Sequence, residues 1–315
     1  MENLLDVYGE GAVLFAVGAG VGVLFGAAAQ HSRFCLRAAT VEVADGQPGW
    51  RLSIWLVAFF AAVFAVQLAI KLGWLRVDDA RQLANVGSLS GAIVGGLMFG
   101  GGMILARGCA SRLLVLSATG NLRAIITGLV LTLVAQASLS GVLAPARESI
   151  AALWQVPGGA SRHLLSVFGI STTAAVVLGG TALVASIYYA IRSGAQASRI
   201  GAGLLVGLAV AAGWIGTYAV AQSSFEVVAI TSVTFTGPSA DTLMGLVNAR
   251  DMPLGFGIGL VPGVFLGAGG AALLSGEWKI QRFGADTPME RYMVGATLMG
   301  FGSMLVGTTL LYLIN

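Results

Sequence analysis

The sequence repeats one pattern eight times: an apolar stretch of about 20 residues, long enough to cross a bilayer, and then a short polar joint. These stretches lie at about 11–30, 52–73, 88–106, 124–144, 165–191, 201–221, 254–275 and 292–313. Only 10% of the residues are charged, whereas soluble domains carry roughly 25%. The pattern therefore predicts an all-α polytopic membrane protein with eight or nine transmembrane helices.

The two ends of the chain resemble each other. A shift of 200 residues aligns 94–109 with 294–309, and five of the sixteen positions are identical, three of them glycines. Spans 1–3 would then correspond to spans 6–8, and this odd displacement inverts one copy relative to the other. We predict a single transmembrane domain over 1–315, with repeat 1 at about 10–122, connecting spans at 123–200 and repeat 2 at about 201–315. Inverted repeats place a transporter's substrate near the bilayer midplane.

Two polar interruptions contain the only cysteines, AAAQHSRFCLRAA at 27–39 and GGGMILARGCASR at 100–112. Helix-compatible residues follow each cysteine, so we expect each thiol at or near the start of a short re-entrant half-helix. The free N–H groups and the dipole at a helix N-terminus attract anions. The candidate contacts are Cys35, Cys109 and Gly108, with electrostatic support from Arg33, Arg37, Arg107 and Arg112.

Two other interpretations of the cysteines stay open. Buried cysteines often act only as small apolar packing residues, so a purely structural subunit is one alternative. A membrane thiol redox protein or sulfur carrier, using a Cys35–Cys109 disulfide or a persulfide, is another. The chain shows no cofactor motif, no zinc spacing and no basic run, so we expect no cofactor, no metal and no nucleic-acid partner.

The longest joint, 221–253, contains SVTFTGPSADTLMGL. An aspartate side chain can accept hydrogen bonds from the first free N–H groups of a helix. We therefore expect Asp241–Thr242 to cap a short half-helix in this joint.

The distribution of basic residues predicts the orientation, because cytoplasmic loops of membrane proteins carry an excess of Lys and Arg. The joints 31–51, 107–123, 192–199 and 279–291 carry eleven Lys or Arg, and the joints on the other side carry six. This asymmetry predicts a periplasmic N-terminus.

The cysteine segments also resemble a known family. GGGMILARGC is similar to the glycine-rich G-x-G-x-x-x-A-x-G-C signature of the YeeE/YedE family of thiosulfate-uptake and related sulfur-transport proteins, and HSRFCLRAA is similar to its first cysteine loop. GLLVGLAVAAGWIGTYAV, ITSVTFTGPSADTLMGL and GIGLVPGVFLGAGGAALLSGEWKIQRF resemble further segments of the family. The resemblance extends over most of the chain.

This resemblance implies an hourglass-shaped protein of the bacterial inner membrane, with a narrow cysteine-lined waist. Thiosulfate would pass through it without a covalent step and could be received by a cytoplasmic sulfur-carrier protein. Cys35 and Cys109 match two of three family cysteines, whereas Thr309, preceded by Thr308, stands at the third position. Arg107 stands where the family usually has a small residue. Hydroxyl groups can donate hydrogen bonds to an anion, so the threonines could replace the third contact. Transport of a different sulfur or selenium species is the alternative that these departures leave open.

Overall fold

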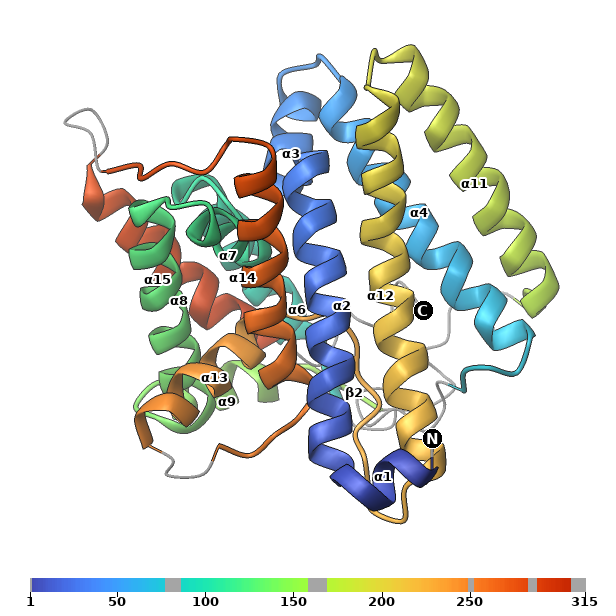
Figure 1. Ribbon diagram of the computed structural model, residues 1–315. Helices are drawn as coiled ribbons and strands as arrows, with labels where there is room; N and C mark the ends of the chain where they lie inside the picture. Colours follow the sequence, from blue (N-terminus) through green and yellow to red (C-terminus); the bar gives the residue numbers. More distant parts are fainter. Residues whose placement is uncertain (1, 77–85, 158–168, 249–251, 283–287, 307–315) are drawn as a thin grey trace.

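A computed structural model describes residues 2–76, 86–157, 169–248, 252–282 and 288–306, and this part of the chain is almost entirely helical (Figure 1). Its two strands, β1 (Gly87–Ser88) and β2 (Gln155–Val156), form one short antiparallel pair. The helices are α1 (Glu2–Tyr8), α2 (Glu10–Ser32), α3 (Leu36–Ala44), α4 (Trp50–Lys71), α6 (Leu89–Leu105), α7 (Ala110–Ala118), α8 (Leu122–Ser140), α9 (Ala144–Ala152), α11 (Thr172–Arg192), α12 (Ala197–Ser223), α13 (Thr236–Asn248), α14 (Phe256–Leu274) and α15 (Met289–Val306). The predicted all-α membrane fold is confirmed.

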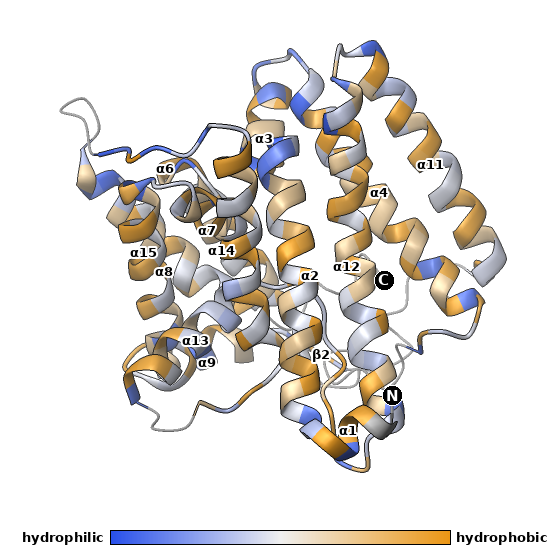
Figure 2. Ribbon diagram, in the orientation of Figure 1, coloured by the Kyte–Doolittle hydropathy of each residue, from blue (hydrophilic) through white to orange (hydrophobic). Residues whose placement is uncertain are grey.

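Seven of the predicted spans coincide with segments long and apolar enough to cross a membrane: Glu10–Ala44, Trp50–Lys71, Leu89–Ala118, Leu122–Ser140, Thr172–Arg192, Ala197–Ser223 and Phe256–Leu274. The eighth coincides with α15, and the last residues predicted for it lie outside the described part of the chain. Figure 2 shows apolar residues along the middle of the long helices and hydrophilic ones gathered toward their ends and in the joints. This distribution is the one that a bilayer requires.

Helices α2 and α14 pack in direct backbone contact, because both carry glycine at every fourth position. A Cβ on Gly22 would lie 2.4 Å from the Leu260 carbonyl oxygen, and one on Gly263 would lie 2.4 Å from the Ala19 carbonyl oxygen. The glycines that make this contact are Gly18, Gly22 and Gly26 on α2 and Gly259, Gly263 and Gly267 on α14. Since lipid supplies no hydrophobic driving force between helices, such close packing is a main source of their association.

Helices α6 and α15 cross through a second glycine contact, and it has the pattern of a two-fold axis. A Cβ on Gly95 would lie 2.5 Å from the carbonyl oxygen of Gly302, and one on Gly102 would lie 2.6 Å from that of Gly295. The 200-residue shift relates Gly95 to Gly295 and Gly102 to Gly302, so each residue contacts the counterpart of the other. Reciprocal contacts of this kind are expected at a two-fold interface. They support the predicted inverted repeat, which stays a prediction.

The start predicted for the half-helix in the 221–253 joint is wrong. α13 begins at Thr236, five residues before Asp241, so Asp241 is not its cap. Thr242 donates a hydrogen bond of 2.6 Å to the Pro238 carbonyl oxygen one turn earlier, as an interior helical residue does. Pro238 explains the early start, because a residue without an N–H group fits the first turn of a helix.

We expect Gly22→Ala to destabilise the fold, because its Cβ would meet the backbone of Leu260 and Val264 rather than a movable side chain. Overpacking of this kind costs about 1–3 kcal/mol, and thermal unfolding of the purified protein in detergent would show it as a lower Tm. Gly20→Ala, in the same helix, is the matched control, because a Cβ there meets nothing within 4 Å. Equal Tm values for the two variants would contradict the importance of the α2–α14 contact.

Candidate anion site

The first cysteine begins a half-helix, as the sequence predicts. α2 ends in a left-handed turn at Arg33, whose φ is 58°, and the Phe34 N–H donates to the Ala29 carbonyl oxygen at 3.2 Å. This is the hydrogen bond of a Schellman motif, which ends a helix. The chain then becomes extended at Cys35, which is the N-cap residue of α3.

The second cysteine lies in the same local structure 74 residues later. Arg107 takes the left-handed conformation with φ 55°, and the Gly108 N–H donates to the Met103 carbonyl oxygen at 3.2 Å. Cys109 follows as the N-cap residue of α7, which has nine residues like α3. Two separate segments of the chain therefore present a thiol at the start of a half-helix, two residues after an arginine.

Both arginines, Arg33 and Arg107, have a strained, left-handed backbone conformation. Arg33 and Arg107 are the non-glycine residues with positive φ in the described part of the chain. A left-handed conformation costs an ordinary L-residue roughly 1–2 kcal/mol, and glycine usually occupies this place after a helix. Strained residues of this kind concentrate at functional sites, so the two side chains are candidates for a role beyond the turn.

A cavity of about 390 Å³ brings the predicted residues together. Its lining includes Cys35 and six arginines, and no Asp or Glu is among the residues that line it. The arginines are Arg33, Arg37, Arg51, Arg107, Arg112 and Arg199. We call this cavity the arginine pocket. The concentration of positive charge indicates a site for an anion.

The sequence did not single out Arg51 and Arg199 as site residues. Arg51 follows Trp50 at the start of α4, and Arg199 is the third residue of α12. The Arg199 guanidinium lies 4.6 Å from the centre of the Trp50 ring and that of Arg51 lies 5.5 Å from it, both within cation–π range. One signal could have found them: an arginine in the first turn of a helix, where the dipole disfavours a cation.

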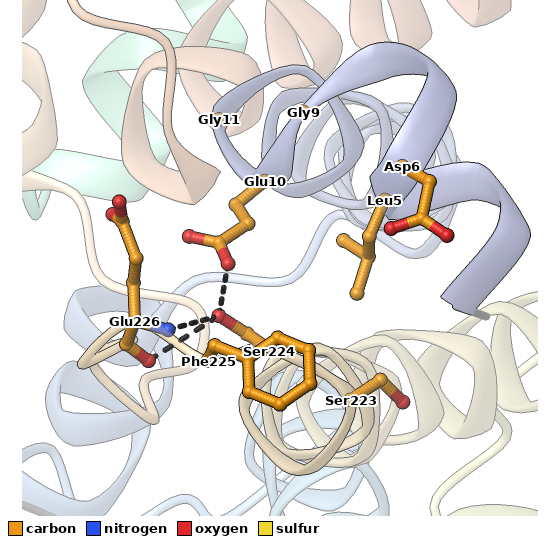
Figure 3. A pocket seen from close by; sticks show the side chains of 9 residues that line it. All are labelled: Leu5, Asp6, Gly9, Glu10, Gly11, Ser223, Ser224, Phe225 and Glu226. Atoms are coloured by element: carbon orange, nitrogen blue, oxygen red, sulfur yellow. Dashed lines mark hydrogen bonds between the residues drawn. The ribbon is translucent and has the colours of Figure 1, made fainter.

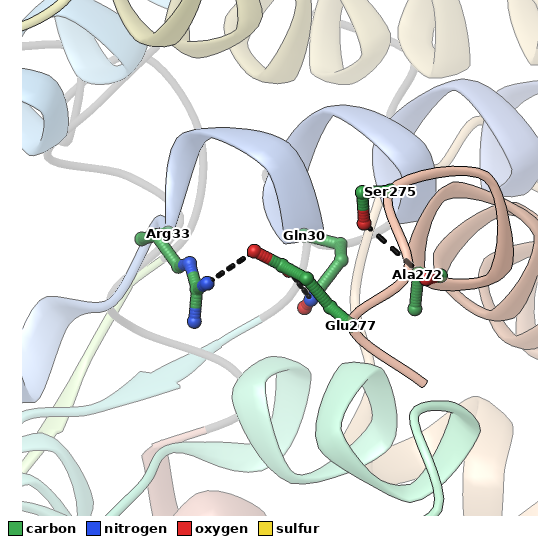
Figure 4. A network of polar contacts seen from close by, with 5 residues as sticks. All are labelled: Gln30, Arg33, Ala272, Ser275 and Glu277. Carbon is green, nitrogen blue, oxygen red and sulfur yellow. Dashed lines mark hydrogen bonds and ion pairs between the residues drawn. The ribbon is translucent and has the colours of Figure 1, made fainter. Parts of the chain in front are cut away.

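The guanidinium groups of the pocket are only partly satisfied by the protein. Arg37 Nε and Arg112 Nη1 are buried and have no hydrogen-bond partner. A buried donor without an acceptor is costly. Arg33 differs, because its Nη2 contacts Glu277 Oε1 at 2.5 Å at the edge of the pocket (Figure 4). An anion in the pocket would supply the missing acceptors.

The two thiols lie at different depths. Cys35 lines the pocket and is partly exposed, whereas Cys109 is absent from the lining and is buried. Cys109 packs in an apolar cluster with Met103, Leu113 and Met299, and Leu36, the residue after Cys35, packs against the same cluster. The Sγ atom of Cys109 lies 3.2 Å from Ser111 Oγ. Both cysteines are free thiols, and of the two Cys35 is the one that lines the pocket.

The opposite end of α2 carries a pocket of the other sign. Glu10 at the start of α2, Asp6 and Glu226 line it, and the Ser224 hydroxyl donates to Glu10 (Figure 3). Because α2 has 23 residues, the two pockets lie about 34 Å apart along its axis. The charges at the two ends of this span are therefore opposite.

The remaining candidate residues are placed as follows. Gly108 is buried in the turn before Cys109. Thr308 and Thr309 lie outside the described residues. No group of three or more His, Cys, Asp or Glu that could hold a metal occurs among the residues that the structure describes.

Comparison with known families gives a match to the family described as sulphur transport, over residues 31–307. The chain belongs to the sulphur transport family. The resemblance of the cysteine segments to YeeE/YedE proteins is thereby confirmed, and a membrane protein that transports sulfur compounds is the function that the family supports. A search of curated proteins finds no significant match. In this sulfur transporter the matched region contains both cysteines and all six arginines of the pocket.

We expect Arg107→Gly to stabilise the protein and to weaken transport. Glycine accepts the left-handed turn freely, so the free energy of unfolding should rise by about 1 kcal/mol. Uptake should fall, because the pocket loses a cation. Arg123→Gly, near the start of α8, is the control with the opposite expectation, since a glycine within a helix is destabilising. Unchanged uptake in Arg107→Gly would remove Arg107 from the site.

Proposed function

We propose that this protein is an inner-membrane permease for a small sulfur-containing anion, that thiosulfate is its substrate, and that no covalent bond forms during passage. The observation that carries the proposal is the arginine pocket: six guanidinium groups without a lining carboxylate, opening onto Cys35. Membership of a sulphur transport family supplies the chemical class of the cargo.

The pocket suits a divalent anion in its charge. Four of its arginines are the second or third residue of a helix, and none of these helices has an acidic residue in its first turn. Their cations and the N-terminal ends of α3, α7 and α12 add to the same positive potential, whereas Glu42 caps α4 by accepting from the Gly49 and Leu52 N–H groups. Thiosulfate brings two negative charges and three oxygens that can accept the unsatisfied guanidinium hydrogen bonds.

The cysteines suit the sulfur end of such an anion. A thiol is a weak hydrogen-bond donor and has a polarisable sulfur. Cys35 is the N-cap residue of α3, so the free N–H groups of the first turn lie beside its thiol, where they can bind an anion. The apolar cluster around Cys109 would exclude hydrated ions. Thiosulfate would therefore exchange oxygen contacts in the pocket for sulfur contacts to the two cysteines, or the reverse, according to the face from which it enters.

We expect Cys109→Ala to abolish growth on thiosulfate as the sole sulfur source, while protein abundance stays unchanged. Uptake of labelled thiosulfate into proteoliposomes measures the same loss directly. Cys109→Ser is the matched variant, because its hydroxyl keeps a donor at the waist and should retain part of the uptake. Wild-type uptake by Cys109→Ala would contradict the relay.

The same proteoliposomes separate transport from the redox alternative. Transport without covalent chemistry requires two free thiols throughout, so labelling with a thiol reagent should be equal before and after treatment with a reductant. An increase in labelling after reduction would instead support a Cys35–Cys109 disulfide as the working state.

The orientation belongs to this proposal as well. A periplasmic N-terminus would place the arginine pocket on the cytoplasmic face, where a soluble sulfur carrier could receive the anion. The pocket itself, however, contains six of the eleven basic residues that support this orientation. Five then remain against the six on the other side, so the charge bias belongs to the binding site, and the orientation needs its own measurement.

We expect Phe225→Cys, at a fully exposed position near the acidic pocket, to react with a membrane-impermeant thiol reagent in intact spheroplasts. Gln47→Cys, exposed in the joint after α3, should react only after permeabilisation. Both substitutions are made in a chain without Cys35 and Cys109. The reverse pattern would place the arginine pocket on the periplasmic face, as the entrance for the anion.

A further inference from the structure

The Glu277 carboxylate is bound to the guanidinium group of a pocket residue, Arg33. Glu277 Oε1 accepts a hydrogen bond from Arg33 Nη2 at 2.5 Å, and Oε2 accepts one from Gln30 Nε2 at 2.9 Å (Figure 4). Arg33 lines the pocket, but Glu277 does not. A negative charge of the protein therefore occupies one of the guanidinium groups that an anion would bind.

The backbone fixes the position of Glu277. α14 ends at Leu274, Gly276 turns the chain with φ 68°, and the Glu277 N–H donates to the Ala272 carbonyl oxygen at 2.8 Å. Glu277 therefore lies just after the C-terminal end of α14. This helix packs on α2, and Arg33 is the residue that follows the last residue of α2.

The segment that follows α14 also contacts the second cysteine segment. The Gln281 N–H donates to the Gly120 carbonyl oxygen at 3.0 Å, and Asn121 Nδ2 donates to Gln281 Oε1 at 2.8 Å, directly after α7. Residues 276–281 therefore contact the turn before Cys35 through Glu277 and the end of the Cys109 half-helix through Gln281. We call these residues the strap.

The Arg33–Glu277 pair is open to exchange. The side chains are 44% and 39% exposed, and an ion pair this exposed to water is weak. An anion in the pocket can reach the same guanidinium and brings two charges against one. Gln30 donates to the other oxygen of the carboxylate, so Glu277 would keep one partner without Arg33.

We propose that Glu277 is a latch on Arg33: it occupies the guanidinium while the pocket is empty and yields it to the incoming anion. Through this contact the strap sets the affinity of the arginine pocket for an anion. It also makes the position of the turn at Arg33 depend on whether an anion is bound. This inference rests on the proposed function, because it names a residue that regulates the same site. Glu277 acts through Arg33, so it is a positioning residue.

The test measures how fast Cys35 reacts with a negatively charged methanethiosulfonate reagent, in the purified full-length protein carrying Cys109→Ala. A neutral reagent of the same class gives the reference rate, so that the ratio of the two rates reports anion recruitment and not access. Glu277→Gln keeps the hydrogen-bonding shape and removes the charge. We expect it to raise the ratio about two- to fivefold, the size expected when one exposed ion pair is lost.

Two controls define the role of Arg33. Adding Arg33→Gln should lower the ratio and should cancel the effect of Glu277→Gln, because the latch then has nothing to hold. Glu148→Gln, which breaks the surface pair with Arg147, should leave the ratio unchanged. A ratio that does not rise in Glu277→Gln, or that rises equally without Arg33, would overturn the latch.

Thiosulfate protection keeps the two proposals apart. Adding thiosulfate should slow the labelling of Cys35, and Glu277→Gln should lower the concentration needed for half protection. Absence of protection in the parent protein would count against thiosulfate as the substrate. The latch is judged separately, by the rate ratio that is measured without thiosulfate.

Discussion

The structure depends on one electrostatic constraint: six arginines gather around one pocket, whose lining holds no Asp or Glu, in a chain that is otherwise adapted to lipid. Arg37, Arg51, Arg112 and Arg199 each lie in the first turn of a helix, where the dipole makes a cation unfavourable, and none of their helices supplies an acidic residue there. All four side chains line one pocket. The cation–π contacts of Arg51 and Arg199 with Trp50 stabilise only part of this charge, which is why we propose that a bound anion compensates the rest.

The glycine contacts make this arrangement possible. The long helices beside the two cysteine half-helices approach each other closely. The α2–α14 contact provides that approach along the span that ends at Arg33, and the α6–α15 crossing provides it along the span that ends beside Arg107. Each cysteine segment thus follows a helix with a glycine face. A close helix pair and an irregular turn are combined twice, and the arginines of both turns line the pocket.

The parts of the fold that local sequence determines could be predicted, and the parts that depend on distant contacts could not. The spans followed from length and apolar content, and the half-helices from helix-compatible residues after each cysteine. Arg51 and Arg199 were missed because they reach the pocket from helices that begin 15 and 162 residues after Cys35. The predicted cap at Asp241 is wrong because Pro238, three residues earlier, already lies in the first turn of α13. The strap could not be predicted, since its contacts join residues more than 150 positions apart.

Basic residues at the ends of membrane helices serve two purposes. Whether the residue lies at the N-terminal or the C-terminal end of its helix distinguishes the two. Lys71 and Arg192 lie in the last turns of α4 and α11, where the dipole stabilises a cation and a topogenic role is sufficient. In the described helices, five arginines are the second or third residue of a helix without an acidic partner in its first turn, and four of them line the pocket. Arg123 of α8 is the fifth and does not. A count of positive charge that ignores helix direction therefore combines the arginines of the pocket with those that report topology.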